Sequence, residues 1–129
     1  MKFALLAVAA VFAFAFDASA LEPSFDIRTE LSRGKTKISS PRLLVLPGRE
    51  ASITQITRKT DEEITVKVVA KDAAKGQIHM KFNVTFRRGN ETVEEAPEFI
   101  LPEGKIGHIP LNGIKGERLK FRVKAKRTL

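Results

Sequence analysis

The ten residues Ile78–Arg87, IHMKFNVTFR, decide the fold class of this chain. Apolar and polar residues alternate along the whole stretch, and successive side chains of a β-strand point to opposite faces. One face would therefore carry Ile78, Met80, Phe82, Val84 and Phe86. On an α-helix the same spacing would scatter these residues around the axis. The stretch predicts a half-buried strand, and the Gly89-Asn90 pair after it is typical of a turn.

Two further stretches alternate in the same way. Leu119–Lys126, LKFRVKAK, places its apolar residues on one face and four basic residues on the other. Ile64–Val68, ITVKV, is followed by the polar segment Asp72–Gly76, so we expect residues 64–70 and 77–87 to form a hairpin.

The remaining strands are shorter. We expect Pro47-Gly48 to form a tight turn between two of them, and Pro97 and Pro102 to favour a sheet edge or a break near Phe99. The expected strands are Phe25–Leu31, Arg42–Leu46, Arg49–Thr57, Glu91–Ile100 and Lys105–Leu111. No stretch has a sustained helical period. About seven or eight short strands predict a single all-β domain, an antiparallel β-sandwich or a small barrel.

The N-terminus has the pattern of a signal peptide. Lys2 precedes the apolar run Ala4–Phe16, and the small residues Ala18-Ser19-Ala20 fit a signal peptidase. The run has 13 residues, whereas a helix that crosses a bilayer needs about 20. We therefore expect residues 1–20 to be removed, residues 21–129 to form the domain, and Leu21–Arg33 to be partly flexible. The protein is expected to be exported, to the periplasm or beyond, and not to be an integral membrane protein.

Composition limits the chemistry. The 129 residues include no cysteine, which excludes disulfides and thiolate chemistry. The net charge of +8 is unchanged by removal of residues 1–20, because Lys2 and Asp17 leave together. Such a surplus favours anionic partners, among them lipid head groups, acidic glycans, nucleic acid and acidic protein surfaces, although solubility alone also explains it.

No catalytic or metal-binding motif stands out. The two histidines, His79 and His108, lack the spacing of metal ligands. A Ser-His-Asp set from Ser39 or Ser40, His108 and Asp61 would need a convergence in space that no motif supports. The four acidic residues between Glu91 and Glu98 are more typical of a solvated segment than of a glycosidase pair. We expect no enzyme, no cofactor and no metal site.

The basic C-terminus is the main candidate site. Seven cations lie within 13 residues, and four of them would form one outward row on a strand over 119–126. The candidate residues for binding an anionic partner are Lys115, Arg118, Lys120, Arg122, Lys124, Lys126 and Arg127. The alternative is that these lysines protect an exposed edge strand from pairing with other molecules.

The segment Ile38–Ile53, ISSPRLLVLPGREASI, resembles part of the C-terminal β-domain of the bacterial secretins, the outer-membrane channels of secretion systems and pili. There a Ser-Pro-Arg entry leads to an apolar strand, a short polar turn and a strand with an Ala-x-Ile pattern. Thr57-Arg58-Lys59 stands where the secretins have a glycine-containing stretch. The resemblance implies a free-standing β-module of a bacterial envelope. It does not imply a channel, because the chain has no room for the membrane-spanning hairpin.

Three functions fit these observations. The first is a non-catalytic exported module that binds a protein partner or assembly in the bacterial envelope. The second is an electrostatic binder of an anionic polymer, such as lipopolysaccharide, acidic glycan or nucleic acid, through the basic C-terminal strand. The third is a secreted enzyme inhibitor that inserts an exposed loop such as Ala96–Gly104 into a protease cleft.

Overall fold

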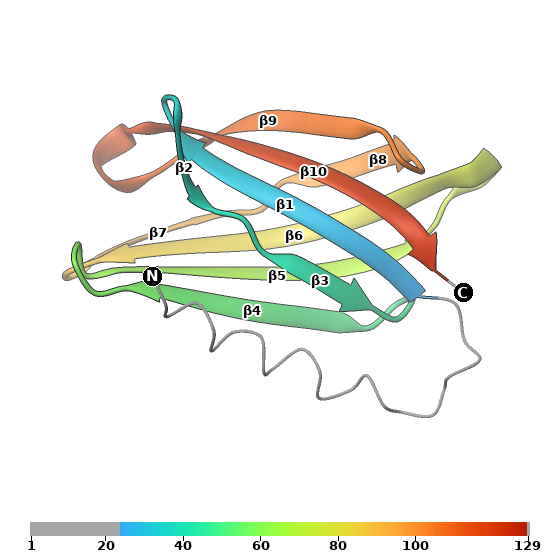
Figure 1. Cartoon of the computed structure of the whole chain (residues 1–129), viewed down its shortest axis with the longest axis horizontal. Coiled ribbons are helices and arrows are strands. Elements are labelled where there is room, and N and C mark those ends of the chain that lie inside the picture. The colour runs from blue at the N-terminus through green and yellow to red at the C-terminus, as the bar shows by residue number, and fades with distance from the viewer. Residues whose placement is uncertain (1–23, 129) are drawn as a thin grey trace.

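A computed structural model of the chain describes residues 24–128, which form two antiparallel β-sheets packed face to face (Figure 1). Sheet A contains β1 (Ser24–Arg33), β2 (Thr36–Ser39), β3 (Arg42–Val45), β9 (Ile106–Asn112) and β10 (Arg118–Thr128). Sheet B contains β4 (Glu50–Thr57), β5 (Glu62–Asp72), β6 (Gln77–Arg88), β7 (Glu91–Glu95) and β8 (Glu98–Pro102). The prediction of an all-β antiparallel sandwich is confirmed, with ten strands among the described residues rather than seven or eight.

Helical structure in the described part of the chain is limited to two short 3-10 turns, Ala74–Gly76 and Ile114–Gly116. None of its helices has the length and apolar character needed to cross a membrane. The expected signal peptide, residues 1–20, lies outside the described residues, as do residues 21–23.

The hairpin expected from the alternating stretches is present in sheet B. β5 and β6 pair antiparallel over eleven positions, from Glu62 opposite Arg88 to Asp72 opposite Ile78. The buried apolar side chains of both strands face the other sheet, and Ile78, Met80 and Val84 are fully buried. The period-two pattern therefore predicted both the strand and its buried face correctly.

The first and last strands of the domain form the middle of sheet A. β1 pairs with β10 over ten positions, and β9 lies on the other side of β10. β10 is therefore not an edge strand, so protection of an edge does not explain its lysines. We expected Leu21–Arg33 to be partly flexible, but from Ser24 onward it forms β1. Its inward residues Phe25, Ile27 and Leu31 are buried, which accounts for its place in the core.

One edge of each sheet is divided between two short strands by a proline. β2 and β3 both pair with β1, on either side of Pro41, and β7 and β8 both pair with β6, on either side of Pro97. Each proline lacks an N–H group but accepts a hydrogen bond through its carbonyl, from the Thr29 N–H at 3.0 Å and the Phe82 N–H at 2.9 Å. The break expected near Phe99 thus lies at Pro97, and most of the expected loop Ala96–Gly104 is strand β8.

The turn at Pro47-Gly48 carries the chain from one sheet to the other. The Arg49 N–H donates to the Leu46 carbonyl at 3.1 Å, and Gly48 has a φ of 75°, which favours glycine. The tight turn is present as expected, but the strands that flank it, β3 and β4, belong to different sheets. Within Arg42–Leu46, Leu43 and Val45 point inward, whereas Leu44 points outward.

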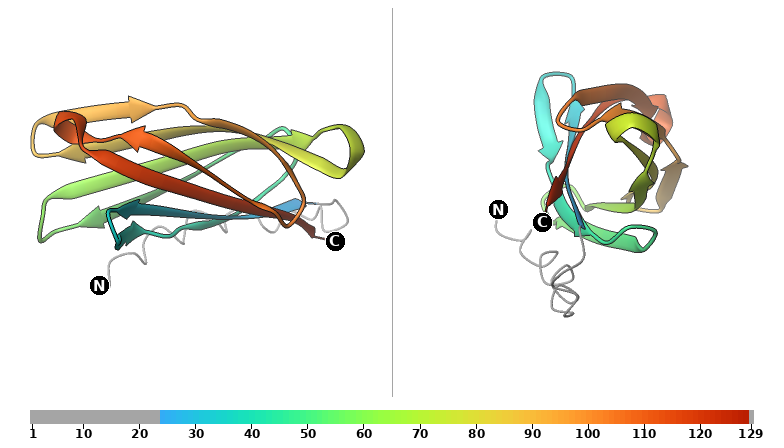
Figure 2. Two further views of the ribbon diagram at one scale, coloured as in Figure 1. Left: turned by 90° about the horizontal axis from the view of Figure 1, so that it is seen from above. Right: turned by 90° about the vertical axis from the view of Figure 1, so that its right-hand side faces the viewer.

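The core lies between the two sheets, which curve around one interior (Figure 2). Phe82 of sheet B and Phe121 of sheet A meet edge to face with their ring centroids 5.1 Å apart, and Phe99 completes the cluster. Such aromatic pairs contribute about 0.5–1.5 kcal/mol beyond the burial of their area. The inward faces are mainly apolar, and their buried polar residues are Thr29 and Ser39.

Candidate functional site

The residues considered for catalysis do not converge. Ser39 is buried and hydrogen-bonded to Gln55 of β4, whereas Asp61 lies 3.9 Å from Arg87 in a salt bridge. His108 lies on the exposed face of β9, opposite Arg122. His79 is hydrogen-bonded to Glu98 on the outer face of sheet B, and this bond lowers the pKa of Glu98. Residues 24–128 contain no group of three or more His, Cys, Asp or Glu placed to hold a metal ion.

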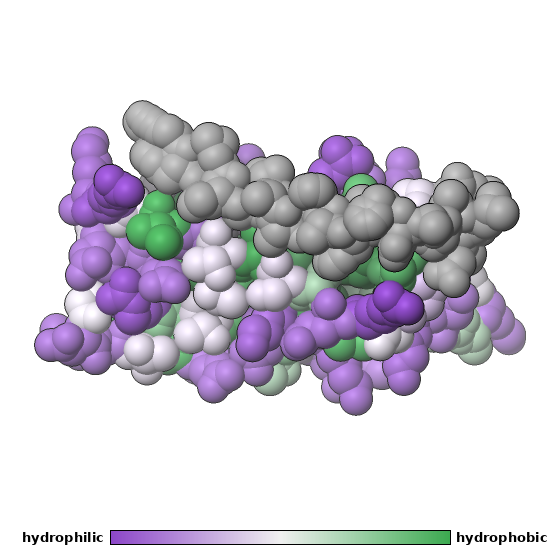
Figure 3. Space-filling view, turned by 90° about the horizontal axis from the view of Figure 1, so that it is seen from below, coloured by the Kyte–Doolittle hydropathy of each residue, from purple (hydrophilic) through white to green (hydrophobic). Residues whose placement is uncertain are grey.

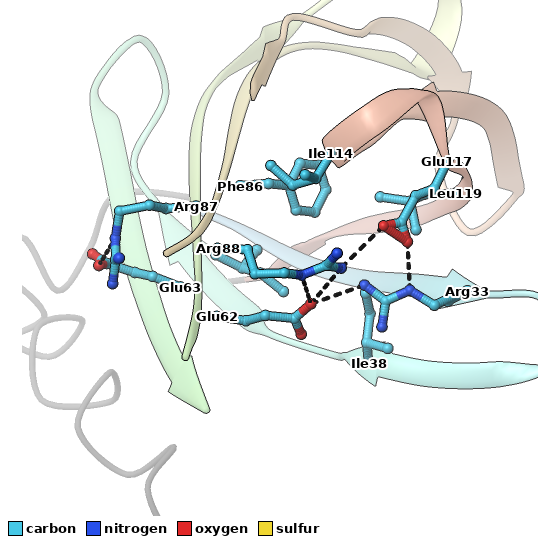
Figure 4. A pocket seen from close by; sticks show the side chains of 11 residues that line it. Arg33, Ile38, Glu62, Glu63, Phe86, Arg87, Arg88, Ile114, Glu117 and Leu119 are labelled. Atoms are coloured by element: carbon cyan, nitrogen blue, oxygen red, sulfur yellow. Dashed lines mark hydrogen bonds and ion pairs between the residues drawn. The ribbon is translucent and has the colours of Figure 1, made fainter. Parts of the chain in front are cut away.

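An ion cluster closes one end of the sandwich (Figure 4). Arg33 at the end of β1 binds Glu117 at 2.5 Å and Glu62 at 3.0 Å, and Arg88 at the end of β6 binds the same two carboxylates at 3.1 and 2.7 Å. Arg33 and Glu117 come from the chain segments of sheet A, whereas Arg88 and Glu62 come from sheet B. The cluster therefore ties the two sheets together.

The charges in this cluster stabilise one another. Burial raises the pKa of Glu62, but hydrogen bonds and charges from Arg88 and Arg33 outweigh this effect, so its pKa is lowered overall. The hydrogen bond from Arg33 lowers the pKa of Glu117. The space enclosed here is only about 10 Å³, roughly enough for one water. With its charges mutually satisfied and no room for a ligand, the cluster has the features of a structural clamp.

Arg127, one of the seven candidate residues, belongs to a second clamp at the opposite end. It lies on the inward face of β10, opposite Phe25, and its guanidinium is 5.9 Å from the centre of that ring. It donates to Asp72 at 2.9 Å and to Glu103 at 2.9 Å. Hydrogen bonds from Arg127 lower the pKa of Glu103. Arg127 is therefore engaged in holding β10 against sheet B.

Five of the other candidate residues form one row. Arg118, Lys120, Arg122, Lys124 and Lys126 alternate with the buried residues of β10 and point away from the core. Alternate residues of a strand lie about 6.6–6.8 Å apart, so the row presents a positive charge at that interval. Lys115 lies outside this row, in the 3-10 turn before β10, where its backbone has a φ of 55°. The row is one residue longer than the four expected.

Neighbouring strands extend the row into a face. The β1 strand places Arg28 beside Lys124, and β3 places Arg42 beside Arg28. Lys37 of β2 lies 3.4 Å from Glu30, on the same side. We call this surface, the outer side of sheet A, the cationic face. Its charged residues are Asp26, Arg28, Glu30, Lys37, Arg42, Arg118, Lys120, Arg122, Lys124 and Lys126.

This face holds eight lysines and arginines but only two carboxylates, a surplus of six positive charges. Asp26 is bound by Arg42 through two bonds of 2.9 Å, and this hydrogen bonding lowers the pKa of Asp26. Glu30 lies between Lys37 at 3.4 Å and Arg122 at 3.8 Å. Among residues 24–128, Arg28, Lys120, Lys124 and Lys126 form no salt bridge, so their charges remain available to an anion.

The outer face of sheet B is different. Its four cations, Lys67, Lys71, Lys81 and Arg87, are matched by four glutamates, Glu50, Glu63, Glu94 and Glu98. Several of them oppose each other across strands, as Arg87 and Glu63 do at 3.1 Å. On the side of β4, where Figure 3 shows the described residues, hydrophilic and neutral side chains separate small hydrophobic areas.

A shallow hollow of about 210 Å³ lies in the cationic face. Arg28 and Glu30 of β1, Arg122 and Lys124 of β10, Ile106 of β9 and Ser40 before β3 line it. The sequence pattern predicted the β10 residues but missed Arg28 and Arg42. Only the alternation around Phe25–Leu31 could have indicated that Arg28 points outward.

No family model and no curated protein sequence matches the chain.

Proposed function

We propose that this chain is an exported, non-catalytic binding protein of the bacterial envelope, and that its cationic face binds an anionic partner. The observation that carries the proposal is the surplus of six positive charges on the outer side of sheet A, beside a balanced outer side of sheet B. A surface of this kind attracts anions over several ångströms and favours their binding.

The uneven distribution of charge supports the interpretation that the excess of positive charge serves binding rather than solubility alone. A net charge that serves only solubility has the same effect wherever it lies on the surface. Here the positive charges gather on one sheet, and some directly oppose each other across strands, which costs stability. Selection for solubility gives no reason for that arrangement, whereas an anionic partner does.

Export is the part of the proposal that depends on sequence alone. It relies on the basic, apolar and small-residue pattern of residues 1–20. An envelope location brings the face within reach of anionic lipids, lipopolysaccharide and acidic glycans.

An acidic protein or assembly is the second candidate partner. The segment Ile38–Ile53, which resembles part of a secretin β-domain, spans the end of β2, all of β3 and the start of β4, and it contributes Arg42 to the cationic face. The third function, an enzyme inhibitor, stays a prediction; most of its example loop, Ala96–Gly104, is strand, because residues 98–102 pair with β6 as β8.

The test compares two charge-reversed variants of the protein, each purified after expression of the full chain. The first carries Lys120→Glu, Arg122→Glu and Lys124→Glu on the cationic face. The matched control carries Lys59→Glu, Lys67→Glu and Lys71→Glu, which change the net charge equally but lie on or beside sheet B. Binding to anionic vesicles, lipopolysaccharide, double-stranded DNA and an acidic protein is measured over a series of salt concentrations.

We expect the wild-type protein to bind at least one of these ligands, with an affinity that falls steeply as salt rises. The first variant should lose this binding while its circular dichroism still shows a β-fold, and the control should keep it. Binding that is insensitive to salt, or equal losses in both variants, would overturn the proposal, as would a wild-type protein that binds none of the four ligands.

A further inference from the structure

One row of the cationic face places three positive charges side by side on adjacent strands. Arg42, Arg28 and Lys124 lie directly opposite one another on the adjacent strands β3, β1 and β10. Side chains in such positions have Cβ atoms about 4.5–5.5 Å apart, and like charges there are destabilising. In the neighbouring rows an acid stands beside the cations, Asp26 next to Lys126 and Glu30 next to Arg122.

The acids of the neighbouring rows form their salt bridges with cations of the face other than Arg28 and Lys124. Asp26 is held by Arg42 through both of its oxygens, and Glu30 lies between Lys37 and Arg122. In the described part of the chain, neither Arg28 nor Lys124 has a salt-bridge partner. These two side chains therefore bring two unpaired positive charges to directly opposite positions of the face.

The hollow of about 210 Å³ lies at this point. This is far more than the space needed for one water and is enough for a small tetrahedral oxyanion. Arg28 and Arg122 bring planar guanidinium groups, which suit bidentate contact with phosphate, and Lys124 brings a compact charge. Ser40 adds a hydroxyl donor, and the carboxylate of Glu30, which pairs with Lys37 and Arg122, also lines the hollow.

Apolar side chains flank the row on both sides. Leu44 of β3 is 45% exposed, and Ile106 of β9, which lies opposite Lys124, is 51% exposed. All five phenylalanines among the described residues are buried, so the face offers no aromatic ring for a nucleic-acid base. Cations between exposed aliphatic side chains fit an anionic lipid surface better, because head groups and acyl chains meet there.

We propose that Arg28, Lys124 and Arg122 form a subsite for the phosphate group of an anionic lipid headgroup, with Leu44 and Ile106 contacting the membrane beside it. This inference depends on the proposed function, since it names the partner of the same face. It adds one claim, that the positive charges at the hollow matter more than the others of the face.

The test uses vesicles of phosphatidylcholine with and without phosphatidylglycerol. The subsite variant is Arg28→Gln with Lys124→Gln. The matched control is Lys120→Gln with Lys126→Gln, which removes two charges from the same face but lies outside the hollow. Each variant is checked by circular dichroism and thermal unfolding. Inorganic pyrophosphate serves as a soluble probe, because it carries the phosphate chemistry without a membrane.

We expect the wild-type protein to bind vesicles that contain phosphatidylglycerol and not those of phosphatidylcholine alone. A diffuse electrostatic surface predicts equal losses for the two variants, since each charge near an anionic membrane contributes about 1 kcal/mol, or roughly fivefold. Direct contact at the subsite predicts a loss at least about tenfold larger for the subsite variant, because hydrogen bonds to charged groups add to the electrostatics. Pyrophosphate should raise the melting temperature of the control but not of the subsite variant.

Three outcomes would overturn the inference, and they are distinguishable from failure of the proposed function. Equal losses in both variants would reject the subsite and leave the cationic face as a diffuse binder. Salt-sensitive binding of DNA or an acidic protein without vesicle binding would reject the lipid and keep the anionic partner. A protein that binds no anionic ligand would reject both proposals.

Discussion

The outer faces of the two sheets are built on the same backbone pattern but carry different arrangements of charge. On sheet B, charges of opposite sign face each other across strands, as Arg87 and Glu63 do, and the net charge is balanced. On sheet A, Arg42, Arg28 and Lys124 form a row of like charge, and six positive charges are in excess. Six of the eight net positive charges of the chain therefore lie on one face of the sandwich.

The two faces also differ in what their charges do for the fold. Opposite charges across strands add a little stability, whereas like charges remove it. The ion clusters that hold the sandwich together lie at its ends, where Arg33 and Arg127 of sheet A reach the carboxylates of sheet B. The cationic face thus contributes little to folding, which leaves it available for binding.

The largest effect on stability is expected at the end cluster. Glu62→Gln removes the carboxylate that Arg33 and Arg88 share, and the Glu62 side chain is only 14% exposed. Because hydrogen bonds to charged groups are strong, the substitution should lower the free energy of unfolding by about 1–2 kcal/mol at neutral pH. The pKa of Glu62 is lowered in the folded state, so its contribution is complete above the ordinary value of about 4.5 and is lost as the pH falls through the folded value.

Urea denaturation at several pH values checks this prediction. The difference between the wild-type protein and the variant should shrink in acid, below about pH 4.5. Glu63→Gln is the matched control, because Glu63 pairs with Arg87 on the exposed face of sheet B, where the two side chains are 34% and 37% exposed. Its effect should be about 0–1 kcal/mol. Equal effects for Glu62 and Glu63 would contradict the structural role of the cluster.

A smaller effect, of opposite sign, is expected on the cationic face. Lys124→Gln relieves the repulsion between Lys124 and Arg28, so it should raise the free energy of unfolding by about 0.2–1 kcal/mol. Lys67→Gln on sheet B is the control, because Lys67 lies between Ser52 and Asn83 and has no like charge opposite it. Its effect should be close to zero. Destabilisation by Lys124→Gln in low salt would show that the row is not repulsive.

Sequence alone predicted the parts of the fold that depend on local alternation. Ile78–Phe86 and Leu119–Ala125 each bury one side, because period-two patterning determines which residues can face a core. The β5–β6 hairpin followed from the short polar segment between its strands. The turns at Pro47-Gly48 and the break at Pro97 followed from the backbone limits of proline and glycine.

Local alternation could not predict which strands pair when they lie far apart in the sequence. Nothing local in Ser24–Arg33 indicates that it pairs with a strand about 100 residues away, yet this pairing makes β10 an interior strand and brings Arg28 beside Lys124. Arg127 was counted among the seven candidate residues because it is close to them in sequence, but its position on β10 directs it inward to Asp72 and Glu103. The cationic face therefore depends on the register between strands, and that register can be read only from the folded structure.

The most direct test of the cationic face is to locate binding residue by residue. Backbone amide chemical shifts are recorded as an anionic ligand, such as inorganic pyrophosphate or short anionic lipid micelles, is titrated into the protein. We predict that the shifted amides cluster on β1, β3 and β10, around Arg28, Arg42 and Lys124, while β5 and β6 change little. Shifts that centre on sheet B, or that spread evenly over both sheets, would contradict the account.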